Sequence, residues 1–263
     1  MQKIKLVVSD IDGTLIPEGS QDFEEGFFDS LDKLLNEGYE FYAASGRPFG
    51  SLYQIFGDFA DRIHYISDNG ILVVENGELV FQDELDQALA EEVAKDVLAM
   101  PEAEIFFSGV EKSFMMPKTE WFIHYVKDVF RFAVKEVKCR EDVDETIIKL
   151  SFFVHDFEKN GERILLFFND KYRGRATVVS SGNGWIDLIE DGFGKGKALR
   201  NVMERKNVRP EEVMVFGDNQ NDVSMFRGMP NSYAKSNSTD AVKAEAQYVC
   251  DSVIKVWKEK IFG

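Results

Sequence analysis

Apolar segments that alternate with amphipathic ones restrict the fold of this 263-residue chain more than any other feature. Apolar segments cover residues 4–9, 39–44 and 63–67, and residues 23–37 carry apolar side chains at helical spacing. Strands that alternate with helices are typical of a parallel sheet covered by helices. A hairpin over residues 71–81, with its turn at Asn76-Gly77, is expected next. The sequence therefore predicts an α/β fold with a doubly wound parallel sheet.

A second unit is expected where the pattern changes after residue 82. The sequence there predicts helices near 86–100, 120–132 and 160–168 and strands at 104–107, 113–116, 146–154 and 177–181. Residues 185–189 then predict a strand that returns to the first sheet. We divide the chain into a core, residues 1–82 and 184–263, and an inserted α+β cap, residues 83–183. Ligands of doubly wound sheets bind at the carboxyl ends of the strands, so we expect the site between core and cap.

Two aspartates one residue apart, Asp10 and Asp12, directly follow the first apolar segment. Side chains alternate along an extended chain, so both carboxylates would point to one side, and Gly13 would let the chain turn there. Two anions this close repel each other unless a cation or a shared proton lies between them. Magnesium is the cation that such oxygen ligands favour. A turn rich in aspartate after a buried strand is the alternative interpretation.

Two further segments contain candidate phosphate-binding groups. The second apolar segment ends in Ser45-Gly46-Arg47-Pro48, where the serine hydroxyl and the following amides are able to hold a phosphate oxygen. Taken alone, this segment is ordinary turn chemistry before a helix. Lys195 opens a helix after residues 185–189. It is either a solvated charge or, if it faces two aspartates and a phosphate, a cation that neutralises both.

A pair of acids, Asp218 and Asp222, follows the apolar segment 213–216. Acids four residues apart face one way on a helical turn. Asp218 would bind a metal directly, Asp222 would hold a metal-bound water or orient Lys195, and Asn221 would donate to a phosphate. Alternatively, Asp218 caps the following helix and the acids are solvated.

In this order the four segments resemble the motifs of the haloacid dehalogenase superfamily of phosphotransferases, namely D-x-D-x-T, a Ser or Thr, a Lys and an acidic pair. Ser-Gly-Arg-Pro, Lys-Gly before an Ala-Leu helix and Gly-Asp-Asn-Gln-Asn-Asp are similar to the Cof-type branch, which has a class IIB cap between the second and third motifs. The resemblance spans residues 4 to about 249. The chain departs from it at residues 231–237, where family members often have Gly-Asn-Ala, and in the amphipathic segment 250–263.

The resemblance implies a magnesium-dependent phosphatase that hydrolyses small phosphorylated metabolites, with sugar phosphates as the expected substrates. Asp10 would be the nucleophile that forms an aspartyl-phosphate, and Asp12 the general acid and base. Magnesium would be held by Asp10, by the backbone carbonyl of Asp12 and by Asp218, with Asp222 behind them. Lys195 would act with the two catalytic aspartates. Groups for the transferring oxygens and the substrate would come from Ser45, Gly46, Arg47, Lys195 and Asn221.

Two other functions stay open at this point. A phosphomutase of the related capped type would use the same aspartates and would grip a second phosphate with basic cap residues. Arg173 and Arg175 are candidates for that grip, although a solvated turn is the favoured interpretation. A non-catalytic protein that binds phosphorylated metabolites is the third possibility, because a fold alone does not determine chemistry. The intact aspartates argue against it.

Composition excludes several classes of partner. A net charge of −16 argues against nucleic acid or an anionic membrane surface, since both require a basic surface. The two cysteines and three scattered histidines form no pattern typical of zinc binding or of a disulfide framework. The first residues lead directly into a strand and no apolar segment reaches membrane-spanning length, so we expect a cytoplasmic protein without a signal peptide. The 23 phenylalanines are expected to pack in the core.

Overall fold

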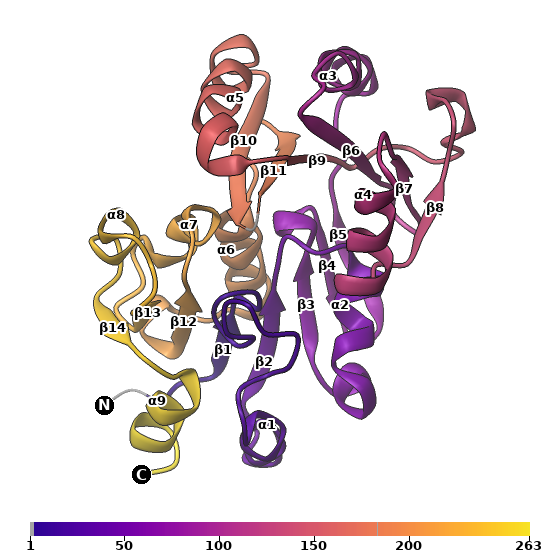
Figure 1. The fold of residues 1–263 in the computed structure, drawn as a ribbon. Coiled ribbons are helices and arrows are strands. Elements are labelled where there is room, and N and C mark those ends of the chain that lie inside the picture. Colours follow the sequence, from indigo (N-terminus) through magenta and orange to yellow (C-terminus); the bar gives the residue numbers. More distant parts are fainter. Residues whose placement is uncertain (1–2, 183) are drawn as a thin grey trace.

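The computed structural model describes residues 3–182 and 184–263, and its two sheets lie one above the other (Figure 1). In this part of the chain the larger sheet, the core sheet, has the strand order β14-β13-β12-β1-β2-β3-β4-β5. Its strands from β14 to β3 are parallel, and β4 and β5 continue it as an antiparallel hairpin. The predicted α/β fold with a mainly parallel core sheet is confirmed. The strands are β1 (Leu6–Ser9), β2 (Glu40–Ala44), β3 (His64–Ser67), β4 (Leu72–Glu75), β5 (Glu78–Gln82), β12 (Val213–Gly217), β13 (Ser232–Lys235) and β14 (Tyr248–Cys250).

Helices cover both faces of the core sheet because its strands are apolar on both sides. In β1, Val7 packs with one helical layer, while Leu6 and Val8 pack with the other. The first layer contains α1 (Phe27–Asn36), α2 (Phe49–Ile55) and α9 (Val253–Lys260), and the second contains α6 (Lys195–Lys206), α7 (Val223–Phe226) and α8 (Asp240–Lys243). The sheet is therefore doubly wound, as expected.

The predicted amphipathic segment at the end of the chain forms helix α9. Its first turn is capped by the Ser252 hydroxyl, which accepts a hydrogen bond from the Lys255 amide. Val253, Val256 and Trp257 are buried, and the Trp257 ring contacts the rings of Phe27 and Phe41. The closing helix thus packs in the core, which is the role its apolar face predicts.

The smaller sheet, the cap sheet, lies above the carboxyl ends of the core strands (Figure 1) and has the order β10-β11-β9-β6-β7-β8. Helices α3 and α5 pack on one of its faces, and α4 with the following π-helical turn packs on the other. The elements are α3 (Gln87–Leu98), β6 (Ala103–Ser108), β7 (Ser113–Met116), α4 (Glu120–His124), the turn Tyr125–Val129, β8 (Val134–Glu136), β9 (Lys149–Val154), α5 (Phe157–Lys171), β10 (Ala176–Gly182) and β11 (Trp185–Glu190). The short strand β8 was not expected from the sequence.

The expected return of residues 185–189 to the core sheet is wrong. Strand β11 pairs antiparallel with β9 and β10, so it belongs to the cap sheet. Its apolar pattern fits a buried strand of either sheet, and only pairing decides between them. The predicted division at residues 82/83 agrees with the end of β5, whereas the second division must follow Glu190 instead of residue 183. Asn183, the expected last cap residue, lies outside the described residues.

The order of the core strands places the candidate site. β1 has β2 on one side and β12 on the other, so the direction of winding changes between β1 and β12. Side chains that follow these strands meet in the crevice at that point. Among the described residues there is no helix whose length and apolar content would let it cross a membrane.

Candidate active site

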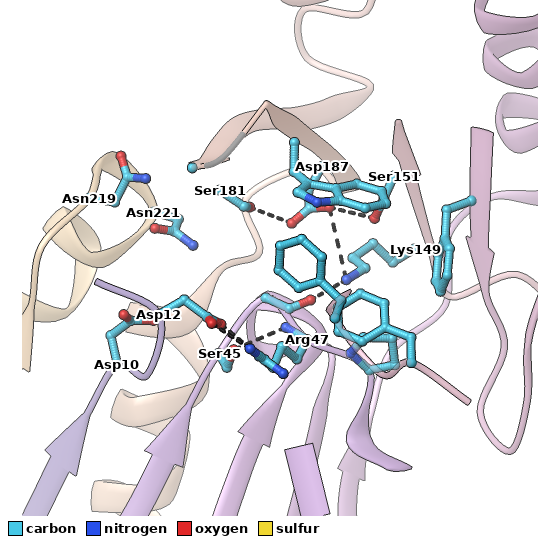
Figure 2. A pocket seen from close by; sticks show the side chains of 17 residues that line it. Asp10, Asp12, Ser45, Arg47, Lys149, Ser151, Ser181, Asp187, Asn219 and Asn221 are labelled. Atoms are coloured by element: carbon cyan, nitrogen blue, oxygen red, sulfur yellow. Dashed lines mark hydrogen bonds and ion pairs between the residues drawn. The ribbon is translucent and has the colours of Figure 1, made fainter. Parts of the chain in front are cut away.

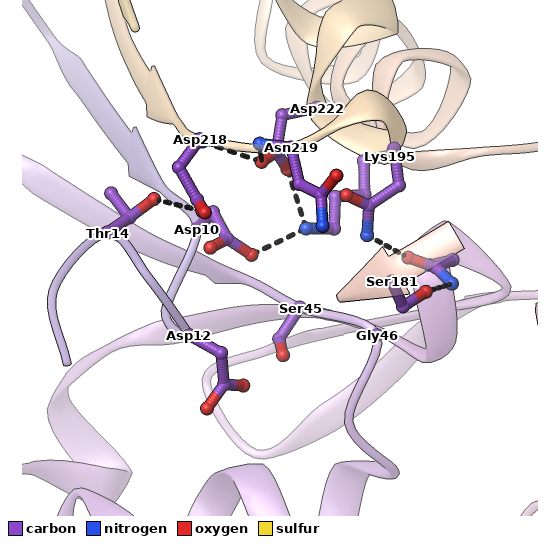
Figure 3. Close-up of polar contacts among 12 residues, drawn as sticks. Asp10, Asp12, Thr14, Ser45, Gly46, Ser181, Lys195, Asp218, Asn219 and Asp222 are labelled. Atoms are coloured by element: carbon purple, nitrogen blue, oxygen red, sulfur yellow. Dashed lines mark hydrogen bonds and ion pairs between the residues drawn. The ribbon is translucent and has the colours of Figure 1, made fainter. Parts of the chain in front are cut away.

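The four sequence motifs converge beneath the cap (Figure 3). Asp10 follows β1, Ser45 follows β2 and Asp218 follows β12, and these three strands are neighbours in the core sheet. Lys195 is the first residue of α6. From the sequence we expected every motif to follow a core strand. The lysine motif instead follows cap strand β11, so the chain returns from the cap to the core at Lys195.

Lys195 lies at the centre of the site. Its Nζ donates to Oδ1 of Asp10 at 2.6 Å and to Oδ1 of Asp222 at 2.7 Å, and its side chain is fully buried. Burial lowers the pKa of Lys195, but the two carboxylates outweigh this effect and leave the pKa above its ordinary value. The lysine is therefore a buried permanent cation that positions two acids. The interpretation of Lys195 as a solvated charge is wrong.

Asp222 organises the loop that carries Asp218. Its Oδ2 accepts hydrogen bonds from the backbone amides of Asp218 and Asn219, at 2.9 and 3.0 Å. A Cβ on Gly217 would lie 2.5 Å from the Asp222 Cβ, so only glycine fits there. Asp218 itself accepts from the Thr14 hydroxyl at 2.8 Å, and Asn219 occupies the cap position of the following turn. Asp218 is therefore not the helix cap that the alternative interpretation proposed.

Asp10, Asp218 and Asp222 form an acidic cluster whose carboxylate oxygens lie within 4.8 Å of one another. Burial, followed by the charge of Asp222, raises the pKa of Asp218 to about 6 and the pKa of Asp10 well above its ordinary value. Asp10 Oδ2 is buried and accepts no hydrogen bond from the described residues. An unpaired oxygen among mutually repelling carboxylates fits a divalent cation with oxygen ligands. The cluster can therefore hold a metal.

Asp12 points away from this cluster (Figure 3). The guanidinium of Arg47 grips its carboxylate, with Nε to Oδ2 at 2.8 Å and Nη2 to Oδ1 at 2.6 Å. Such a two-pronged pair fixes the plane of the carboxylate. Arg47, which the sequence assigned to the substrate, is thus engaged with Asp12 in this structure.

Ser45, Gly46 and Asn221 line the same pocket as Asp10 and Asp12. The Ser45 hydroxyl oxygen accepts from the Arg47 amide at 3.1 Å, which leaves its proton free to donate. Asn221 Nδ2 donates to the side chain of Asn69 at 2.9 Å. The structure therefore brings every predicted site residue to one place, while their roles stay predictions.

The cap closes the pocket with polar residues that the sequence analysis missed (Figure 2). Lys149 of β9 is buried, donates to the Gly46 carbonyl at 2.5 Å and forms an ion pair with Asp68 at 3.1 Å. Asp187 of β11 accepts from Asn69 at 2.5 Å and from Ser151 at 2.5 Å. These contacts join cap to core across the site. A charged residue inside each apolar segment of the sequence, Lys149 within 146–154 and Asp187 within 185–189, was the available signal.

The core side of this contact has an unusual backbone. Asp68 and Asn69 have φ of 50° and 57°, and Gly70 has φ of 97°. Left-handed conformations of non-glycine residues cost free energy and are concentrated at functional sites. Here the conformation presents Asp68 to Lys149 and Asn69 to Asp187. The sequence assigned this segment only to the approach of a hairpin.

The closed pocket has about 50 Å³ of free volume. This is room for a few water molecules and is far less than a sugar phosphate requires. A molecule of that size therefore fits only if residues that line the pocket move apart.

Arg173 and Arg175 lie outside this pocket. Both are largely exposed, and they pair with Asp170 at 2.7 Å and Glu92 at 2.9 Å. The favoured interpretation of this segment as a solvated turn agrees with these positions.

Comparisons with known proteins agree with the fold and the motifs. The profile of the haloacid dehalogenase-like hydrolases matches residues 7–255. The 5-amino-6-(5-phospho-D-ribitylamino)uracil phosphatase YbjI of Escherichia coli K12 is 28% identical over 245 residues, which are 93% of this chain and 90% of that protein. The crystal structure of SMU.1108c from Streptococcus mutans UA159 superposes with a TM-score of 0.88 at 26% identity and covers 99% of this chain and 100% of that one. A subclass IIB sugar phosphatase superposes with a TM-score of 0.80 at 22% identity, over 97% and 98% of the two chains, which is a likeness of fold.

Proposed function

The chain belongs to the haloacid dehalogenase-like hydrolase family, and from this premise we propose that it is a magnesium-dependent phosphatase of sugar phosphates. As a Cof-type, subclass IIB member of the family, it is a phosphatase that acts on small phosphorylated metabolites. Magnesium as the metal, sugar phosphates as the substrates and the individual residue roles are the parts that we propose.

One observation supports the proposal above all others. Asp10 Oδ2 is unpaired in a buried site, while Asp10 Oδ1 is held by Lys195. The free oxygen of such a carboxylate would bind the metal, while the oxygen that Lys195 orients would attack phosphorus in line and form an aspartyl-phosphate. The residues that would hold magnesium are Asp10, Asp218 and the backbone carbonyl of Asp12, with Asp222 behind them. When bound, the metal supplies positive charge at the transferring phosphoryl group.

Asp12 would give a proton to the leaving oxygen and then take one from the attacking water. Its carboxyl must separate from part of the Arg47 fork before it can carry that proton, because the guanidinium stabilises the ionised form. An anionic substrate offers Arg47 another partner. Arg47 would therefore release Asp12 and contact the substrate in the same movement.

Sugar phosphates fit the polar part of the pocket. Ser151 and Ser181 donate to Asp187, and Lys149 Nζ lies 3.9 Å from the same carboxylate, so these four residues offer the donors and acceptors that hydroxyl groups require. The E. coli relative acts, by its name, on a compound with a phosphorylated ribityl chain. The phosphomutase alternative has less support, since Arg173 and Arg175 pair with acids outside the pocket.

The test is phosphate release from a panel of phosphate monoesters, with magnesium and with a chelator. We expect release from sugar phosphates that requires magnesium and is lost in Asp10→Asn. Acid quenching during turnover, followed by mass spectrometry, should find phosphate on the peptide that contains Asp10. An isomerised sugar phosphate without free phosphate would show a mutase instead, and turnover that survives in Asp10→Asn would refute the nucleophile.

A further inference from the structure

The cap side of the pocket is half polar and half aromatic. Four rings line the aromatic half, which we call the aromatic wall: Phe106 of β6, Phe130 and Phe132 from the loop before β8, and Trp185 of β11. The Trp185 ring lies 5.9 Å from Phe106, 6.2 Å from Phe130 and 6.4 Å from Phe132, between ring centroids. These separations are those of packed aromatic pairs. The polar half contains Lys149, Ser151 and Asp187.

Trp185 has a polar group that this packing leaves unused. Its Nε1 is buried and has no hydrogen-bond partner among the described residues, and the whole side chain is only 7% exposed. Buried indole N–H groups normally find an acceptor, and an unsatisfied one costs free energy. Trp185 lines the pocket, so a molecule bound there would supply that acceptor once the cap moves and exposes Nε1.

The aromatic wall lies next to the proposed acid–base group. The Arg47 guanidinium is 5.7 Å from the Phe130 centroid and 5.6 Å from the Phe132 centroid, and the same guanidinium grips Asp12. Arg131, between the two phenylalanines, has φ of 56°, a strained conformation within the loop that presents both rings. The wall is therefore on the side of the pocket that receives the leaving group.

We propose that the aromatic wall is a subsite for a planar heterocycle in the leaving group, with a carbonyl oxygen or ring nitrogen that accepts a hydrogen bond from Trp185 Nε1. This inference rests on the proposed phosphatase function and narrows its substrate class. The ring would stack on Phe130 or Phe132, while the polar half would bind the hydroxylated chain or sugar that joins ring to phosphate. The substrate is then a sugar or polyol phosphate that carries a planar heterocycle.

Matched ligand pairs test this subsite. Ribose phosphate and uridine monophosphate, both esterified at the terminal carbon of the ribose, differ only by the planar ring, and so do ribitol phosphate and flavin mononucleotide. We expect kcat/KM to be roughly tenfold or more higher for at least one ring-bearing member than for its ringless partner, as stacking and one hydrogen bond together provide. Equal values within both pairs would overturn the proposal.

Three variants test whether the preference for ring-bearing ligands comes from the aromatic wall. Trp185→Phe removes the N–H and keeps a ring, and it should reduce the ratio of ring-bearing to ringless kcat/KM by about tenfold, the effect of one hydrogen bond. Phe132→Leu, which removes a stacking face, should also reduce the ratio and serves if Trp185→Phe does not fold. Phe167→Leu, an exposed ring on α5 outside the pocket, is the control and should leave the ratio unchanged.

A binding measurement separates this inference from the proposed function. Calorimetry with Asp10→Asn and magnesium should give a lower Kd for the ring-bearing ligand of a pair, and Trp185→Phe in the same background should reduce the difference. If no phosphate ester is hydrolysed but the difference in Kd is present, the proposed function fails and the subsite stands. If esters are hydrolysed but neither Kd nor kcat/KM depends on the ring, the subsite alone fails.

Discussion

Replacing Asp10 with asparagine should abolish turnover and stabilise the metal-free protein. Asp10, Asp218 and Asp222 surround a single cation, Lys195, so the buried cluster carries an excess of negative charge when no metal is bound. The pKa of Asp218 near 6, compared with 3.8, corresponds to about 3 kcal/mol for keeping this group ionised at neutral pH. Burial and the charge of Asp222 raise the Asp218 pKa, and burial together with the charges of Asp222 and Asp218 raises the pKa of Asp10, so Asp10→Asn removes a charge that this cluster disfavours.

The opposing effect is the loss of the charge-assisted hydrogen bond to Lys195, which is worth about 1.5–3 kcal/mol. The asparagine side-chain oxygen still accepts a hydrogen bond from Lys195, but as a neutral group it keeps only part of this free energy. We expect a net gain of about 1 kcal/mol without metal, which raises Tm by about 2–4 °C in a chain of this size. Magnesium should stabilise the wild type more than the variant, because the variant has lost a ligand. The turnover should fall by a factor of about 10⁴ or more, the range for a lost nucleophile.

The assay is thermal unfolding of both proteins with magnesium and with a chelator, together with phosphate release. Asp191→Asn is the matched control, since Asp191 is an exposed aspartate that precedes the same lysine motif. A metal-free Asp10→Asn protein that melts several degrees below wild type, with the control unchanged, would refute the repulsion argument. Turnover within tenfold of wild type would refute the nucleophile assignment.

Three further predictions follow from the same contacts. Gly13→Ala should lower the free energy of unfolding by about 1–2 kcal/mol, because Gly13 has φ of +88°. It should also raise the magnesium concentration needed for activity, because the new Cβ would lie 2.2 Å from Asp218 Oδ2. The control is Gly19→Ala, at φ of +76° in open space, which should change only stability. Lys149→Met should reduce kcat/KM by roughly tenfold or more and increase amide exchange in β9, because it leaves Asp68 buried and unpaired. The double variant with Asp68→Asn should recover both kcat/KM and the protection of β9, and a double variant that recovers neither would argue against the ion pair. The contribution of Asp218 to the stability of the metal-free wild type should fall as pH rises from about 4 to 6, because the raised pKa means that Asp218 binds its proton more tightly in the folded state than in the unfolded state. A dependence of stability on pH that is unchanged in Asp218→Asn would contradict this.

Local patterns were sufficient to predict most secondary elements and the residues of the acidic cluster. Helix α9, the hairpin β4–β5 and the strands before Asp10, Ser45 and Asp218 are visible from apolar periodicity and turn residues alone. The motif residues could be found because each follows a strand in a short pattern. Their roles as nucleophile, acid and ligands stay predictions.

The sequence by itself determined that this chain has an α/β core with acids directly after two of its strands, because both properties follow from residues close together in the chain. Only the tertiary structure decided that β11 belongs to the cap, that Arg47 grips Asp12 and that Lys149 and Asp187 join cap to core. Lys149 meets the Gly46 carbonyl across 103 residues and Asp187 meets Asn69 across 118. Such contacts depend on which of several compatible strands pair, and neither propensity nor periodicity determines that choice.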